Sequence, residues 1–253
     1  MINYKIVQKQ DLIVTSSVSQ ITKIPVNLII ESLHHTHEIF DKFIDFGVNV
    51  FEILGMRNLS AFIGEVFARS IALKSNGLFI SNPHQDGYPD LLLMDNLGLK
   101  DYANLKDRLK DKLPFSPFVN GGIEVKATCG SVPTPAACKK KGFEKPGIGD
   151  TRIKSLTGYD WKAHHRDTNN LIGLLWDFIE GVPRIVAVFY GDNLTIDDWS
   201  PIIQPKEGGG RTTSVSIMTR SGVKKMYDNT VVVINDIDYL NFLNKYNKST
   251  YLK

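Results

Sequence analysis

The spacing of apolar residues in the first third of the chain predicts helices. From Val26 to Ile44 apolar residues recur every three or four positions, which places them on one face of a helix, and Pro25 suits its first turn. Gly47 interrupts this pattern, and Asn58 or Ser60 can cap a later helix that stops at an Asn-Gly pair. We therefore predict three helices, over 25–44, about 48–56 and about 58–76.

Shorter apolar runs in the rest of the chain predict β-strands. Two of them, 171–178 and 184–190, flank a Glu-Gly-Val-Pro stretch that is typical of a hairpin turn. The segment 208–222 alternates polar and apolar residues, which predicts a half-buried strand that displays hydroxyl groups. The charged segment 97–112 is interpreted as a solvated surface helix or loop, and 128–150 as a long loop. Further strands are expected at 12–14, 78–80, 91–94, 123–127 and 231–234, and a last helix at 236–246.

Length and composition favour one α/β domain in a reduced compartment. The 253 residues, 42% of them hydrophobic, suffice for one sizeable core or two small ones, and neither a repeat nor a linker divides them. We expect a single domain, 1–253, in which 1–57 is a helical N-terminal portion and 58–253 is the core. No apolar run approaches the ~20 residues that span a bilayer, and no signal-peptide segment follows Met1. Two cysteines make no disulfide framework, so a cytoplasmic protein without a membrane is expected.

Three charged residues flank or occupy two of the predicted strands. Asp90 directly precedes the run 91–94, and Glu124 and Lys126 stand two positions apart, so their side chains point to one face. If the strands are neighbours, two carboxylates and one ammonium group meet. Carboxylate oxygens suit Mg²⁺, and a lysine beside the ion can polarise a water molecule or offset the charge of a phosphate. An ordinary strand start and an exposed strand face are the alternative, and nearby Asp86 and His84 are explained as turn formers.

Pro89-Asp90, followed after a gap by Glu124-Val125-Lys126, resembles the signature of the PD-(D/E)XK nucleases, and of type II restriction endonucleases in particular. The resemblance covers about 65–130 and rests on these residues and on the order of helix, strand and strand. It implies a restriction-endonuclease-like fold, with a mixed central sheet flanked by helices. It also implies sequence-specific hydrolysis of double-stranded DNA that depends on Mg²⁺ and leaves 5′-phosphates.

The resemblance also assigns roles to individual residues. Asp90 and Glu124 would ligate Mg²⁺, and Lys126 would orient or activate the attacking water. In this family a helix before the first motif strand often supplies another acidic residue, and Glu65 resembles it. The alternative for Glu65 is a solvated glutamate at the edge of the apolar face of its helix.

Basic residues outside the motif are candidates for DNA contacts. The formal net charge of +3 and the pI of about 8.7 permit a nucleic-acid partner without establishing one. Three adjacent lysines in the predicted long loop could bind phosphates, although a merely solvated loop explains them too. The alternating segment has an arginine near each end, and arginine and hydroxyl groups can read base edges, although a solvated edge strand is equally compatible. The candidates are Lys139, Lys140, Lys141, His164, His165, Arg211, Thr212, Thr213, Ser214, Ser216 and Arg220.

Other functions remain open at this point. The spacing of Cys129, Cys138, His164 and His165 fits no compact zinc-ligand pattern. A DNA repair nuclease or junction resolvase could use the same carboxylates and lysine, a non-catalytic DNA-binding protein could retain them, and an unrelated α/β enzyme would bind no DNA. If the chain reads a palindromic site, we expect a homodimer, because protein symmetry mirrors site symmetry.

Overall fold

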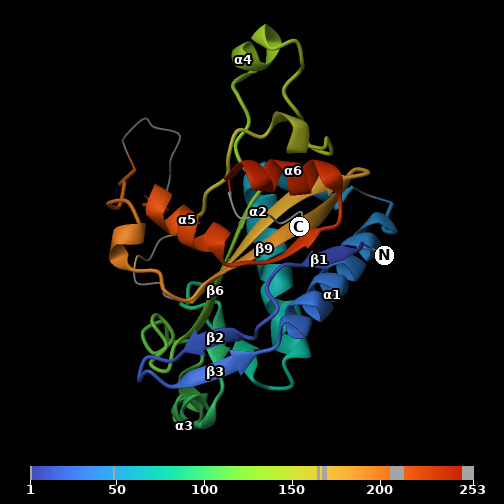
Figure 1. Ribbon diagram of the computed structural model, residues 1–253. Helices are drawn as coiled ribbons and strands as arrows, with labels where there is room; N and C mark the ends of the chain where they lie inside the picture. Colours follow the sequence, from blue (N-terminus) through green and yellow to red (C-terminus); the bar gives the residue numbers. More distant parts are fainter. Residues whose placement is uncertain (1, 48, 164–165, 167–169, 206–213, 247–253) are drawn as a thin grey trace.

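A seven-stranded mixed sheet forms the centre of the molecule in the computed structural model (Figure 1). The structure describes residues 2–47, 49–163, 166, 170–205 and 214–246. The strand order is β1-β11-β9-β8-β6-β5-β4, in which β6 and β8 are parallel and every other neighbouring pair is antiparallel. The strands are β1 (Tyr4–Ile6), β4 (Phe79–Ser81), β5 (Leu91–Leu93), β6 (Gly122–Thr128), β8 (Leu171–Ile179), β9 (Val182–Gly191) and β11 (Thr230–Ile234). The predicted α/β class and mixed sheet are confirmed.

Helices cover both faces of this sheet, which explains the uninterrupted apolar runs in its central strands. Alternate residues of β8, including Leu174 and Trp176, pack against α1 (Val26–Ile44) and α2 (Val50–Lys74). Leu171 and Leu175, on the opposite face, pack with α5 (Arg220–Asp228) and α6 (Ile237–Tyr246). No helix of the described part of the chain is long and apolar enough to cross a membrane.

Most of the predicted elements are confirmed, including the interruption between the second and third helices. Gly55 has φ 64° and ψ 157°, so α2 consists of a short and a long helical segment on either side of it. A positive φ is easily adopted only by glycine, which explains why the break occurs at this residue. The hairpin of β8 and β9 turns at Glu180 and Gly181, as its sequence predicts.

The N-terminal portion and the predicted long loop differ from expectation. Residues before α1 hold β1, which joins the central sheet, and a hairpin of β2 (Leu12–Thr15) and β3 (Ile21–Ile24), so this portion is only partly helical. The segment 128–150 contains helix α4 (Pro135–Lys140), whose cap, Thr134, accepts from the Ala137 N–H. The segment 97–112 contains α3 (Asn96–Ala103) and a 3₁₀ turn, Lys106–Arg108. A Thr-Pro cap was the missed signal for α4.

A buried histidine links α1 to the sheet. His37 is 5% exposed, and its Nε2 accepts the Ile185 N–H at 3.0 Å. Burial, together with the charges of Arg184 and His34, lowers the pKa of His37 to about 3. The histidine is therefore a packing residue that joins α1 to β9.

We expect the stability of the fold to fall below about pH 6.5 because of His37. In that range the unfolded chain binds a proton that the folded chain excludes, down to the folded pKa of about 3. The loss is about 1.4 kcal/mol per pH unit, hence about 2 kcal/mol between pH 7.5 and pH 5. Urea unfolding of the unaltered chain and of His37→Gln at both pH values measures it. Equal pH dependence in the two proteins would contradict this assignment.

Candidate active site

Asp90 and Glu124 lie where strands β5 and β6 part. The register pairs Leu91 with Ile123 and Leu92 with Gly122, and it ends there. Beyond this point the carboxylates replace the ladder of backbone hydrogen bonds. The Asp90 N–H donates to Glu124 Oε2 at 3.2 Å, and the Val125 N–H donates to Asp90 Oδ2 at 2.8 Å. The two acidic side chains therefore fasten the parting strands to each other.

A glycine permits this close pairing of the two strands. Gly122 has φ 155°, and a Cβ atom there would lie 1.9 Å from the carbonyl oxygen of Leu91. No side chain fits that distance, so the strand start requires glycine at this position. Gly122 thus has a structural role beside the motif.

Lys126 completes the group of charges. Its Nζ forms an ion pair with Glu124 Oε1 and lies 3.5 Å from Asp90 Oδ2. The Glu124 side chain is 6% exposed, whereas those of Asp90 and Lys126 are 23% and 24% exposed. The structure thus brings together the three residues of the motif, and solvent reaches the group from the side of Asp90 and Lys126.

Burial and mutual charge set the protonation of this group. Burial raises the pKa of Glu124, as does the charge of Asp90, while Lys126 lowers it. Burial acts to lower the pKa of Lys126, but the charges and hydrogen bonds of Glu124 and Asp90 outweigh it and raise that pKa. Lys126 therefore remains protonated and can donate hydrogen bonds, but it cannot accept a proton from water.

Glu65, on α2, is coupled electrostatically to this group. Its side chain is exposed on α2, but partial burial and the charge of Asp90 raise its pKa, against the lowering effect of Arg69 and Lys126. These couplings place Glu65 within electrostatic range of the motif without making it part of the hydrogen-bonded group. The assignment of Glu65 to the active site stays a prediction.

The donor set fits a hard divalent cation better than a transition metal. Asp90 and Glu124 offer carboxylate oxygens, and with Lys126 the group carries one net negative charge when all three are ionised. A cation would also favour the ionised form of Glu124, which burial disfavours. Within the described residues no three His, Cys, Asp or Glu side chains group as metal ligands, so remaining ligands would come from water or substrate. Mg²⁺ accepts such a mixed shell.

The face of the sheet that carries these charges also carries α5. The β6–β8 register places Glu124 beside Leu171 and Lys126 beside Gly173. Trp161, which precedes β7, and Met226, which is in α5, cover Gly173: a Cβ there would lie 2.6 Å from the Trp161 ring and 2.8 Å from the Met226 methyl. Helix α2 packs on the opposite face of the sheet.

A pair of glycine substitutions tests this packing. We expect Gly173→Ala to destabilise the fold by about 1–3 kcal/mol, because the new methyl group overlaps buried side chains. Gly64→Ala, whose Cβ would lie 3.9 Å from the Ala127 Cβ, should instead stabilise α2 by about 0.5–1 kcal/mol. Thermal or urea unfolding measures both. Equal effects of the two substitutions would contradict the described packing beside Lys126.

Within its described part, the predicted strand over 208–222 is confirmed only as β10 (Ser216–Ile217), and its expected C-terminal end is wrong. Helix α5 begins at Arg220, after its cap, Thr219. Ser216 is fully buried and donates its hydroxyl hydrogen bond to the Ser200 carbonyl, so it does not face solvent. The alternation was misread because this pairing and the helix cap are not visible in the period-two pattern.

The remaining DNA-contact candidates are only partly described. Strands β10 and β7 (Lys162–Ala163) form a two-stranded antiparallel sheet in which Ser216 pairs with Ala163. Ser214 therefore lies beyond the end of this sheet that holds Ala163. Ser214 donates to Gln204, and Arg220 is exposed in the first turn of α5. Lys139, Lys140 and Lys141 are exposed. His164, His165, Arg211, Thr212 and Thr213 lie outside the described residues.

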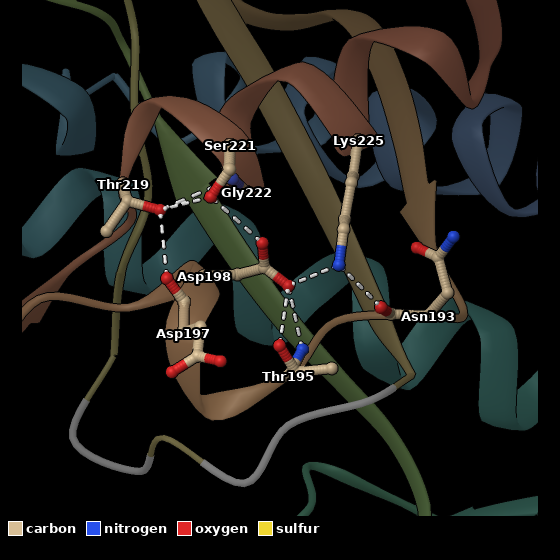
Figure 2. Close-up of polar contacts among 8 residues, drawn as sticks. All are labelled: Asn193, Thr195, Asp197, Asp198, Thr219, Ser221, Gly222 and Lys225. Atoms are coloured by element: carbon tan, nitrogen blue, oxygen red, sulfur yellow. Dashed lines mark hydrogen bonds and ion pairs between the residues drawn. The ribbon is translucent and has the colours of Figure 1, made fainter.

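Asp198, which sequence reasoning missed, fixes the start of α5 (Figure 2). Its buried carboxylate accepts from the Thr195 N–H, from Ser221 Oγ and from Lys225 Nζ at 2.7 Å. Burial acts to raise the pKa of Asp198, but these hydrogen bonds and the charge of Lys225 lower it. The signal in the sequence was the Thr-x-x-Asp spacing of a capping box.

No protein-family model, no curated protein and no solved structure matches the chain.

Proposed function

We propose that the chain is a Mg²⁺-dependent endonuclease of the PD-(D/E)XK type, a type II restriction enzyme that cuts double-stranded DNA at a specific sequence. The observation that carries the proposal is the group formed by Asp90, Glu124 and Lys126 where β5 and β6 part. A mixed sheet between two layers of helices is compatible with the restriction-endonuclease-like fold. A homodimer and a cytoplasmic location stay predictions.

The residues divide the chemistry between them. Asp90 and Glu124 would hold the metal ion, whose charge polarises the scissile phosphate and stabilises the leaving oxygen. Lys126, kept protonated by both carboxylates, donates a hydrogen bond that orients the attacking water and offsets charge on the phosphate. Glu65, whose pKa responds to the charges of Asp90 and Lys126, would complete the shell of metal or water around the site.

Digestion of plasmid DNA tests the proposal and separates its rivals. We expect cuts in both strands at one recurring sequence, in Mg²⁺ but not in a chelator, with 5′-phosphates at the sequenced ends. Cuts confined to junctions or mismatched duplexes would assign a structure-specific nuclease instead. DNA binding that resists the chelator, with no cleavage, would assign a non-catalytic DNA-binding protein. The absence of any DNA binding would contradict the restriction enzyme, the structure-specific nuclease and the DNA-binding protein alike.

A further inference from the structure

A long excursion of the chain, residues 129–152, projects from the sheet. We call it the α4 arm, and Figure 1 shows it extending away from the strands, with α4 at its outer end. It follows β6 directly, so its root is the strand that carries Glu124 and Lys126. The position of the arm is therefore tied to that of the candidate active site.

The outgoing end of the arm pairs with the segment that follows it, and the returning end is anchored to the sheet. At the outgoing end, the Ser131 N–H donates to the Gly158 carbonyl at 2.8 Å. At the returning end, the Arg152 and Ile153 N–H groups donate to the carboxylate of Asp177, which is 1% exposed in β8. Because a buried carboxylate on a central strand holds this end, the base of the arm has a fixed place on the protein.

The tip of the arm presents three adjacent cations to solvent. Thr134 caps α4, and the buried Cys138 thiol donates to the Pro133 carbonyl, which folds the tip on itself. Lys139, Lys140 and Lys141 follow, all exposed, and none forms an ion pair with another described residue. The dipole of so short a helix does not explain three neighbouring like charges, which repel one another. A polyanion would relieve that repulsion.

We propose that the α4 arm binds the phosphate backbone of duplex DNA outside the cleaved bond, and this inference rests on the proposed nuclease function. Pro135 follows Lys126 by nine positions, which span at most about 30 Å, and the helical turns from Pro135 to Lys141 add about 9 Å. At 3.4 Å per base pair, the lysines would therefore contact phosphates within about twelve base pairs of the cleaved bond. The arm thereby adds sequence-independent affinity to the complex.

The salt dependence of binding to a duplex of about forty mixed-sequence base pairs, in Ca²⁺, tests the inference. We expect the triple variant Lys139→Ala, Lys140→Ala, Lys141→Ala to lower the slope of log affinity against log salt by about 2.7, which is about 0.9 for each phosphate that a lysine no longer neutralises. Between 50 and 200 mM salt the unaltered chain should therefore lose about 40-fold more affinity than the variant does. Replacing the three lysines by arginine should preserve the slope.

A matched variant controls for net charge. Lys100, Lys106 and Lys110 are also exposed, in and after α3, and replacing them by alanine removes the same charge elsewhere. An arm variant with an unchanged slope, or a control variant with the same fall, would overturn the arm assignment. If the unaltered chain binds and cuts DNA in the same preparations, that outcome refutes the arm alone. An unaltered chain that neither binds nor cuts DNA would refute the nuclease function as well.

Discussion

Asp90→Asn is expected to abolish Mg²⁺-dependent cleavage, with a fall in rate on the order of 10³-fold or more, while the chain still binds duplex DNA. The substitution removes one of two metal-binding carboxylates, yet an amide oxygen can still accept the Val125 N–H that holds the strands together. It also removes a negative charge that would face the phosphate. DNA affinity without metal should therefore hold or increase, and the gain in affinity that Ca²⁺ gives the unaltered chain should disappear.

Cleavage rate and DNA affinity, each measured beside a control variant, decide this prediction. Asp86→Asn makes the same chemical change in the same loop, at a side chain that is 73% exposed and 4.0 Å from Lys112. It should cut like the unaltered chain. A folded Asp90→Asn protein that cuts at the unaltered rate would remove Asp90 from the site.

Lys126→Met is expected to slow cleavage by on the order of 10²–10³-fold while leaving DNA binding and the Ca²⁺ response in place. Methionine keeps most of the side-chain volume but cannot orient water or offset charge on the phosphate. Both carboxylates remain, so the metal site persists. Lys126→Arg should recover part of the rate because it restores the positive charge.

The pH profile separates this role of Lys126 from a merely structural one. Lys126 lowers the pKa of Glu124, which burial raises, so its loss should move ionisation of Glu124 to higher pH. Since metal binding needs the ionised carboxylate, the rise of cleavage with pH should shift upward in Lys126→Met. Lys112→Met, at an exposed lysine, should keep the unaltered profile and rate. Matching profiles for all three proteins would contradict the role of Lys126.

Local signals in the sequence predicted much of the fold. The apolar spacing of α1, the turn between β8 and β9 and the presence of a break between two helical segments of α2 depend on neighbouring residues, and they were predicted. The strand β1 could not be found in this way, because Tyr4 pairs with Ile234 near the other end of the chain. A three-residue strand carries little pattern of its own.

In the candidate site, too, features that depend on neighbouring residues were predicted and contacts between distant residues were not. The two carboxylates and the lysine were predicted because the motif is short and each residue lies beside an apolar run. Whether they meet depends on the pairing of β5 with β6, which the sequence alone left conditional. The buried Ser216 hydroxyl donates to the Ser200 carbonyl, and the buried Asp198 carboxylate accepts from Lys225 of α5. Such contacts between distant residues have no period, so pattern reasoning missed them.

The carboxylates of Asp90 and Glu124 are expected to make DNA cleavage depend on a divalent cation. The most direct measurement is the single-turnover rate of plasmid cleavage by the unaltered chain as Mg²⁺ is raised from zero. We predict no cleavage in a chelator or in Ca²⁺ alone, and a rate that rises with Mg²⁺ to a plateau. Cleavage that persists in the chelator, or no cleavage at any Mg²⁺ concentration by a folded, DNA-bound protein, would contradict this dependence on the cation.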